Sequence, residues 1–335
     1  MQVGPLIALA LVLPILTLSF WVGMRAGRRR ELSFPTVVLL VFLGMPNVPW
    51  SYPLIPMAYG LGFGWGIQPE YRCRRKRRLE IQKMRAVLQS DQLELHYQPI
   101  VKSSTGEIVA VEALCRWRQA DGTWRAPGPW LDILLDPELA VEFADWCWRT
   151  ALTEARRWPH VRLNVNVVAF RMEEPGWAQK VLGHLIQAGV SPFQITIEVT
   201  ESMMLKKTPI VIENLQHLKA AGVHIALDDF GTEMANVKTL MDFPIDTIKI
   251  DKDLVQAADR DYAQVLIELG HCTGRLIVAE GVETEEQAAW LRSLGVDTHQ
   301  GWLYHKAMPG LLVHGEIRKS WMLNARGRQP WRLGE

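Results

Sequence analysis

The sequence has few cysteines, almost no net charge and no low-complexity linker. Its four cysteines form no Cys-x-x-Cys pair, which argues against a disulfide framework or a zinc site and is typical of a reducing compartment. The formal net charge is only +1, which argues against binding a nucleic-acid polymer. No Ser/Gly-rich stretch separates the N-terminal 90 residues from the rest, so we expect no independent sensor domain between them.

Charged residues are missing from two N-terminal stretches. Residues 3–24 contain none, and a helix of that length, rising about 1.5 Å per residue, can cross a hydrocarbon core of about 30 Å. We predict a membrane span there. A cleaved signal peptide is the alternative, disfavoured because no basic region precedes the stretch and no small-residue cleavage site follows it. Residues 32–67 form the second stretch, which five prolines interrupt and which predicts a kinked span or a hairpin.

Basic residues on both sides of the second stretch favour the hairpin. Four arginines lie within residues 25–30 and six basic residues within 72–78, and basic flanks prefer the cytoplasm. Two plain spans are the alternative, and either topology leaves the rest of the chain in the cytoplasm. We interpret the run at 72–78 as a contact with anionic lipid rather than a nucleic-acid patch. The predicted boundaries are a membrane segment at 1–68 and a basic juxtamembrane and linking helix at 69–90, where apolar residues recur at helical spacing.

Six short apolar runs follow, each ending in a carboxylate or its amide. The runs are VAVE, LNVN, ITIE, IALDD, IKID and IVAE, which end at Glu112, Asn166, Glu198, Asp228 with Asp229, Asp251 and Glu280. Most are separated by roughly 20 to 30 residues, which is room for one strand, one helix and two turns. We therefore predict a (β/α)8 barrel over residues 91–323, followed by a basic tail at 324–335.

The acidic ends of these runs predict a metal site. Functional groups in a (β/α)8 barrel gather at the C-terminal ends of the strands, so these side chains should lie together. Buried carboxylates repel one another and lose hydration, and divalent cations held by oxygen ligands are the usual counter-charge. The sequence therefore predicts a metal-dependent enzyme.

Eight ordered motifs carry a resemblance to a known family. They are YQPI from Tyr97, EAL from Glu112 followed by CRW, VNV around Asn166, EVTES from Glu198, DDFGT from Asp228, IKID from Ile248, AEGVET around Glu280 and QGW from Gln300. Together they resemble the EAL domain, the cyclic di-GMP phosphodiesterase family of bacteria. The resemblance implies a modified (β/α)8, TIM-like barrel that binds two Mg²⁺ or Mn²⁺ ions and opens cyclic di-GMP to linear pGpG. With the N-terminal segment, it implies an enzyme of the bacterial inner membrane whose catalytic domain is cytoplasmic.

The resemblance also implies roles for individual residues. The expected metal ligands are Glu112, Asn166, Glu198 and Asp228 for one ion, with Asp228 bridging, and Asp229 and Glu280 for the other. Glu280 is also the expected general base, and Lys249 is expected to orient the attacking water or to stabilise the charge on phosphate. The residues expected to hold the substrate or order water are Gln98, Arg116 and Gln300.

Three further residues are expected to support this site. Glu201 would anchor the loop after DDFGT, Asp251 would hold Lys249 by a charge-assisted bond, and Glu283 would have a similar supporting role. His299 and His305 lie near Gln300 but have no matching partner cluster, so we interpret them as surface or packing residues rather than metal ligands.

One loop departs from the family pattern and keeps a second hypothesis open. Where the family has Gly-Tyr-Ser-Ser-Leu after DDFGT, this chain has Glu233 to Val237, and in the family this loop is tied to dimer formation and metal geometry. The intact acidic residues and Lys249 favour a membrane-anchored phosphodiesterase, while the altered loop favours a non-catalytic receptor or scaffold. The expected partners are cyclic di-GMP, membrane lipid, a second copy through the barrel and a membrane protein. No GGDEF-like synthase stretch is present.

Overall fold

The computed structural model describes residues 73–204, 208–231, 237–257 and 260–325. The chain divides into two compact units, Met1–Leu79 and Glu80–Glu335. Only residues 73–79 of the first unit are described, and they are helical. The predicted membrane stretches at 3–24 and 32–67 lie outside the described residues, as does the altered loop apart from the backbone of Val237. Within the described ranges, no helix is long and apolar enough to cross a membrane.

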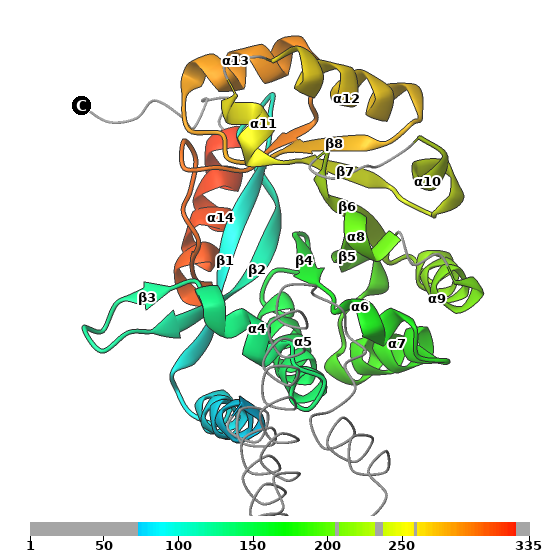
Figure 1. The fold of residues 1–335 in the computed structure, drawn as a ribbon. Helices are drawn as coiled ribbons and strands as arrows, with labels where there is room; N and C mark the ends of the chain where they lie inside the picture. Colours follow the sequence, from blue (N-terminus) through cyan, green and yellow to red (C-terminus); the bar gives the residue numbers. More distant parts are fainter. Residues whose placement is uncertain (1–72, 205–207, 232–236, 258–259, 326–335) are drawn as a thin grey trace, which may run out of the picture. The chain divides into compact units, whose positions relative to one another are not determined.

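Ten strands form one sheet in the described part of the second unit, and Figure 1 labels β1 to β8 among them. The strands are β1 Leu93–Lys102, β2 Ile108–Arg118, β3 Trp124–Arg125, β4 Arg162–Asn166, β5 Ile195–Thr200, β6 His224–Phe230, β7 Thr247–Ile250, β8 Leu276–Ala279, β9 Thr298–His299 and β10 Met308–Pro309.

Strand β1 closes eight of these strands into a barrel. It pairs with β2 on one side and β9 on the other, so the circuit runs β1-β2-β4-β5-β6-β7-β8-β9 and back to β1. Within this circuit both pairings of β1 are antiparallel, whereas those linking β2, β4, β5, β6, β7, β8 and β9 are parallel. The short connection between β1 and β2 cannot hold a crossover helix, which a parallel pair would require. The predicted modified (β/α)8 barrel is therefore confirmed.

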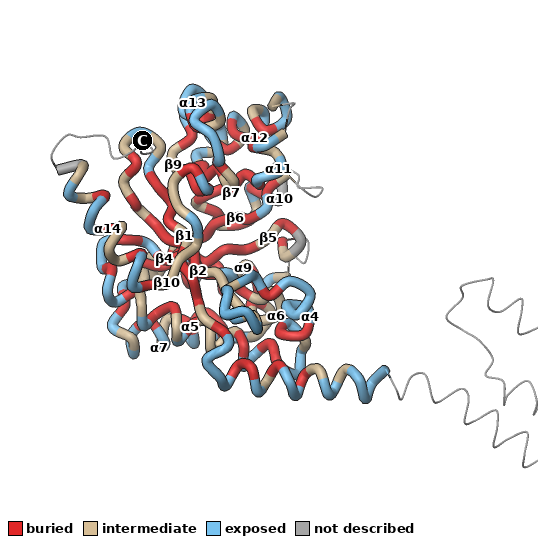
Figure 2. The backbone as a smooth tube through the Cα atoms, turned by 90° about the vertical axis from the view of Figure 1, so that its left-hand side faces the viewer, coloured by how far each residue is buried: buried red, intermediate tan, exposed pale blue. Residues whose placement is uncertain are grey.

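Helices cover the outside of the barrel (Figures 1 and 2). They are α4 Leu131–Leu134, α5 Ala140–Ala155, α6 Ala169–Met172, α7 Trp177–Ala188, α8 Glu201–Met204, α9 Pro209–Ala220, α10 Val237–Asp242, α11 Lys252–Gln256, α12 Asp261–Cys272, α13 Glu285–Ser293 and α14 Gly310–Ala325. Two short 3-10 helices, η1 Gly128–Trp130 and η2 Pro192–Gln194, complete the set, with a helix over residues 80–88. Helix α14 extends two residues into the predicted tail.

Capping residues determine where helices begin, and the spacing of apolar residues determines which helix face is buried. Thr284 caps α13 in a capping box, because its hydroxyl accepts the Gln287 N–H while the Gln287 side chain accepts the Thr284 N–H. In α5, Ala140, Phe143 and Ala151 are among the buried positions, as expected for a stripe that packs on the sheet. These helices bury the apolar outer face of the parallel strands.

The helix over residues 80–88 is tied to the barrel domain. Its Ile81 and Met84 pack with Leu134 and Phe143 in a small second core. On the surface, Arg85 Nε donates to Glu142 Oε1 at 3.0 Å. Within the linking helix predicted at 69–90, residues 80–88 are helical and the helix ends at residue 88.

Candidate active site

The barrel brings most of the predicted site residues to one end of its strands. Glu112 lies in β2, Asn166 ends β4, Glu198 lies in β5, Asp228 and Asp229 lie in β6, Lys249 lies in β7, and Glu280 and Gln300 directly follow β8 and β9. In the strand register, Gln98 lies opposite Glu112 and Asn166 lies opposite Glu198. This is the end of a (β/α)8 barrel at which catalytic groups lie.

Lys249 is the centre of this cluster. Its side chain is only 1% exposed, and its Nζ lies within ion-pair distance of four carboxylates. The distances are 2.7 Å to Glu280 Oε1, 2.8 Å to Asp228 Oδ1, 2.9 Å to Glu198 Oε1 and 3.6 Å to Glu112 Oε2. One buried cation therefore faces four carboxyl groups.

Two amides fix the orientation of Glu112. Asn166 Nδ2 donates to Glu112 Oε1 at 3.1 Å, and Gln300 Nε2 donates to Glu112 Oε2 at 2.7 Å. Gln300 is itself placed by the backbone, since its N–H donates to Ala279 O at 2.8 Å and its carbonyl accepts the Val282 N–H at 3.0 Å. Both oxygens of Glu112 thus have fixed directions, as a ligand carboxylate requires.

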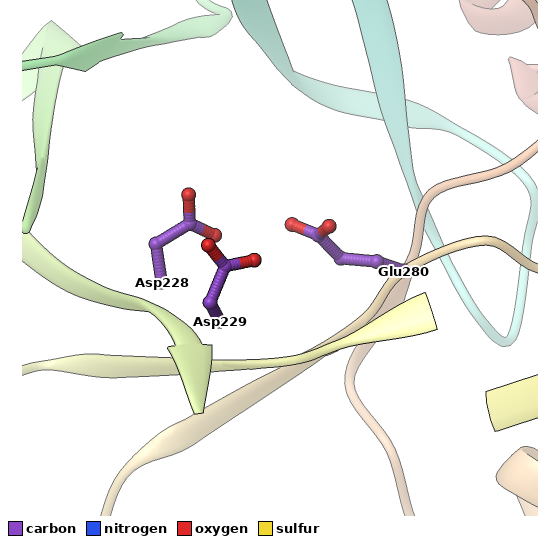
Figure 3. Close-up of side chains that lie close together, drawn as sticks. All are labelled: Asp228, Asp229 and Glu280. Atoms are coloured by element: carbon purple, nitrogen blue, oxygen red, sulfur yellow. The ribbon is translucent and has the colours of Figure 1, made fainter. Parts of the chain in front are cut away.

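An irregularity in β6 presents two consecutive carboxylates to the site. The pairing of β6 with β7 shifts between Leu227 and Phe230, and Asp229 has a φ of 55°, the one positive φ outside glycine among the described residues. In a regular strand, consecutive side chains point to opposite faces. Here one oxygen each of Asp228, Asp229 and Glu280 lie within 4.8 Å of one another (Figure 3).

These donors suit hard divalent cations. All three groups of this cluster offer carboxylate oxygens, which favour Mg²⁺ or Mn²⁺ over softer metals. Glu198 adds a further donor, because its Oε2 is buried and has no hydrogen-bond partner within the described ranges. The residues present therefore fit a divalent-cation site.

Burial and mutual repulsion raise the pKa of several carboxyl groups. Burial, then Glu112, raises the pKa of Glu198 well above its usual value. Burial raises the pKa of Glu280 to about 8, and Lys249 opposes this rise without cancelling it. The pKa of Asp229 rises to about 6, through burial and then Asp228. Such shifts are concentrated at functional sites.

The same cluster keeps Lys249 charged. Burial alone would lower the pKa of this amine, but the surrounding carboxylates, Glu112 and Glu198 foremost, raise it well above its usual value. Lys249 is therefore a permanent cation here and cannot take up a further proton.

Two predicted substrate-binding residues flank Glu112. Gln98 Nε2 donates to His305 O at 3.3 Å. Arg116 lies four residues after Glu112 on β2, and its guanidinium donates to Cys115 O at 2.9 Å. Burial lowers the pKa of this guanidinium. Because alternate residues of a strand share a face, Arg116 lies on the Glu112 side of β2.

The supporting residues behave differently from one another. Glu201 is 3% exposed and its Oε2 accepts the Gly231 N–H at 3.4 Å, just after β6. The prediction that Asp251 holds Lys249 is wrong: its carboxylate caps α11 by accepting the Asp253 N–H at 2.8 Å and is not among the ion-pair partners of Lys249. Asp251 lies two positions after Lys249 and would share its face only if the strand stayed regular, but helix α11 begins at once.

Glu283 lies at the surface, outside the cluster. Its side chain is exposed, and its backbone N–H donates to Gln287 Oε1 at 2.8 Å in the turn before α13. Among the described residues its carboxylate makes no hydrogen bond or ion pair that would give it the predicted supporting role.

Sequence reasoning missed Asn164. Its Nδ2 donates to Glu198 Oε1 at 2.8 Å, and the residue is 5% exposed. The signal was available in the run LNVN, since Asn164 precedes Asn166 by two positions and so shares its face of the strand.

Comparison with known proteins agrees with this geometry. The EAL domain family model matches residues 80–307. "Uncharacterized signaling protein" of Caulobacter vibrioides is 35% identical over 241 residues, covering 70% of this chain and 30% of that protein. "Probable cyclic di-GMP phosphodiesterase PdeB" of Escherichia coli (strain K12) is 33% identical over 236 residues, covering 68% of this chain and 45% of that protein.

A solved structure extends the agreement to the whole domain. "PaMucR Phosphodiesterase, c-di-GMP complex" is 32% identical with a TM-score of 0.66, covering 70% of this chain and 99% of that one. The chain spans less than half the length of the two curated relatives. Since the family model covers more than half of the chain, and both relatives exceed 30% identity over two thirds of it, the chain belongs to the EAL domain family.

Proposed function

We propose that this protein hydrolyses cyclic di-GMP to linear pGpG, using two divalent cations, Mg²⁺ or Mn²⁺. The observation that carries the proposal is the convergence of four carboxylates on Lys249 at the C-terminal end of the barrel. The substrate class comes from the relative named as a cyclic di-GMP phosphodiesterase and from the PaMucR structure in complex with c-di-GMP.

The cations would be held by the carboxylates and one amide of the cluster. Glu112, Asn166, Glu198 and Asp228 would hold one, with Asp229 and Glu280 at the other. When bound, such cations neutralise charge on the phosphate and lower the pKa of water beside it.

The remaining steps belong to side chains of the chain itself. Glu280 would accept the proton of the attacking water. Lys249 would orient that water and oppose the charge that develops on the phosphate. Arg116 would hold the substrate phosphate with its planar guanidinium, with Gln98 as a neighbouring donor.

We also propose a membrane-anchored setting, which the N-terminal sequence supports. The apolar stretches at 3–24 and 32–67 would anchor the protein in a bacterial inner membrane with the barrel in the cytoplasm. The basic residues at 72–78 would contact anionic lipid. A homodimer through the barrel and a membrane protein partner complete the proposed assembly.

Turnover of cyclic di-GMP by the purified full chain tests the proposed activity. Linear pGpG should form with Mg²⁺ or Mn²⁺ and not with EDTA. Glu112→Gln preserves the shape of the side chain but removes the charge at its centre, so it should abolish product formation. Glu286→Gln is the matched control, because Glu286 is an exposed partner of Arg260 at 3.2 Å.

One result would overturn the proposed site and another the proposed activity. Product that forms equally with Glu112→Gln would place the chemistry elsewhere. Tight binding of cyclic di-GMP without turnover, in the presence of either metal, would instead identify a receptor.

A further inference from the structure

Asn164 contacts a carboxylate at the proposed cation site and is buried beneath it. It lies in β4, is 5% exposed, and its Nδ2 donates to Glu198 Oε1 at 2.8 Å. Lys249 Nζ lies 2.9 Å from the same Oε1. A neutral donor and a cation thus hold one oxygen of Glu198 from two directions.

The other oxygen of Glu198 is left without a partner. Its Oε2 is buried and accepts no hydrogen bond from any described residue. A buried carboxylate oxygen without a partner is costly, and such groups persist mainly where a ligand or ion satisfies them. Two donors on Oε1 and none on Oε2 therefore define which oxygen is available to a cation.

The position of β4 explains how one strand supports two carboxylates. It lies between β2, which carries Glu112, and β5, which carries Glu198. Asn166 donates toward β2, to Glu112 Oε1 at 3.1 Å, while Asn164 donates toward β5. The two amides share one face of β4 at a spacing of two residues, so together they hold the carboxylates on either side of it.

We propose that Asn164 is a positioning residue for divalent-cation binding, which fixes Glu198 Oε1 so that Oε2 is presented to the ion. The proposal rests on the proposed function in that Glu198 is a cation ligand. An amide suits this role because it donates a hydrogen bond without adding charge to the cluster. Outer partners of ligand side chains typically contribute 10- to 100-fold to metal affinity.

Mn²⁺ binding to the full chain, measured by calorimetry without substrate, tests this role. Asn164→Leu removes the donor with little change in volume, and Asn164→Ala is a second variant that avoids any clash. Both should weaken Mn²⁺ binding about 10- to 100-fold. In turnover assays, added Mn²⁺ should restore kcat in both variants while the KM for cyclic di-GMP stays near the wild-type value.

Asn214→Ala is the matched control for a buried asparagine. Asn214 is 3% exposed in α9, and its side chain bonds the backbone of Met172, Glu174 and Ala178 away from the site. This variant should lower the Tm but leave Mn²⁺ affinity unchanged, which separates lost stability from lost positioning.

Each remaining outcome overturns a specific statement. Wild-type Mn²⁺ affinity in both Asn164 variants would overturn the positioning role and leave the proposed function intact. Loss of folding in both would overturn it too, by assigning Asn164 to the fold. A wild-type protein that binds Mn²⁺ without turnover would overturn the proposed enzyme alone, whereas absence of Mn²⁺ binding would overturn both.

Discussion

Lys249 Nζ lies 2.7 Å from Glu280 Oε1, and this contact joins the middle of β7 to the residue that follows β8. It forms even though burial and neighbouring carboxylates favour a protonated Glu280. Asp228 lies 2.8 Å from the same Nζ and therefore competes with Glu280 for this cation. In the described structure Lys249 is therefore the counter-charge shared by carboxylates that would otherwise only repel one another.

Replacing Lys249 should destabilise the cation-free protein strongly. Lys249→Met keeps the length of the side chain but leaves several buried carboxylates without a counter-charge, and loss of one partner of a buried pair typically costs about 3–5 kcal/mol. We expect a loss of this size in the free energy of unfolding, measured by urea denaturation in EDTA. Added Mg²⁺ should restore part of it, because a bound cation replaces the missing charge.

Lys219→Met is the matched control for this variant. Lys219 pairs with Asp246 at 2.7 Å, but its side chain is 41% exposed, and exposed pairs contribute about 1 kcal/mol or less. Equal losses in the two variants would contradict the proposed role of Lys249.

Cation binding should release protons near neutral pH. With a pKa of about 8, Glu280 is mostly protonated at pH 7 in the cation-free protein, and a ligand carboxylate must lose its proton. We expect Glu280 to contribute about one proton per protein at pH 7 and about a tenth of that at pH 9, and Glu198, whose pKa is also raised, to add to the release. Mg²⁺ calorimetry in buffers of different ionisation enthalpy measures this number, and equal release at both pH values would refute the assignment.

Asp229 should tolerate asparagine but not valine. Its φ of 55° lies in the left-handed region, which Asn adopts readily and which costs a β-branched residue about 1–2 kcal/mol. Urea denaturation should therefore show Asp229→Val less stable by that amount and Asp229→Asn close to wild type. Both should bind Mg²⁺ at least about tenfold more weakly, because the cluster loses a charge; unchanged binding would remove Asp229 from the site.

Much of the site was predictable because it depends on where strands end. An apolar run that stops at a carboxylate indicates both the strand and the edge at which the side chain lies, and this placed Glu112, Glu198 and Glu280 together. The antiparallel pairing of β1 was less accessible, since strand direction follows from connection length and from barrel closure.

Contacts across strands could not be deduced from a run of letters. Asn164 and Asn166 are alike in the sequence, yet one bonds Glu198 and the other bonds Glu112. Asp251 directly follows its strand as Glu280 does, but it caps α11. Asp251 differs from the residues of the cluster because a helix starts directly after it, and the free N–H donors of that helix need a capping group.

His299 should make the protein less stable in mild acid. The residue is 0% exposed in β9, and its Nδ1 lies 2.9 Å from the Tyr304 hydroxyl, in line with the predicted packing role. Burial, then Arg292, lowers the pKa of its imidazole from 6.5 to about 4. The unfolded chain therefore binds more protons between pH 6.5 and pH 4, so this contribution to stability is complete above pH 6.5 and is lost as the pH falls.

The size of this effect can be measured against a variant that does not titrate. At pH 5 the shift corresponds to about 2 kcal/mol less stability than at pH 7.5. Urea denaturation of both proteins at the two pH values measures this difference. Between pH 7.5 and pH 5 the wild type should lose more unfolding free energy than His299→Gln by this amount, since the loss that remains in His299→Gln comes from other groups. Parallel pH dependence in the two proteins would show that His299 is protonated as readily in the folded barrel as in the unfolded chain, which its complete burial in β9 argues against.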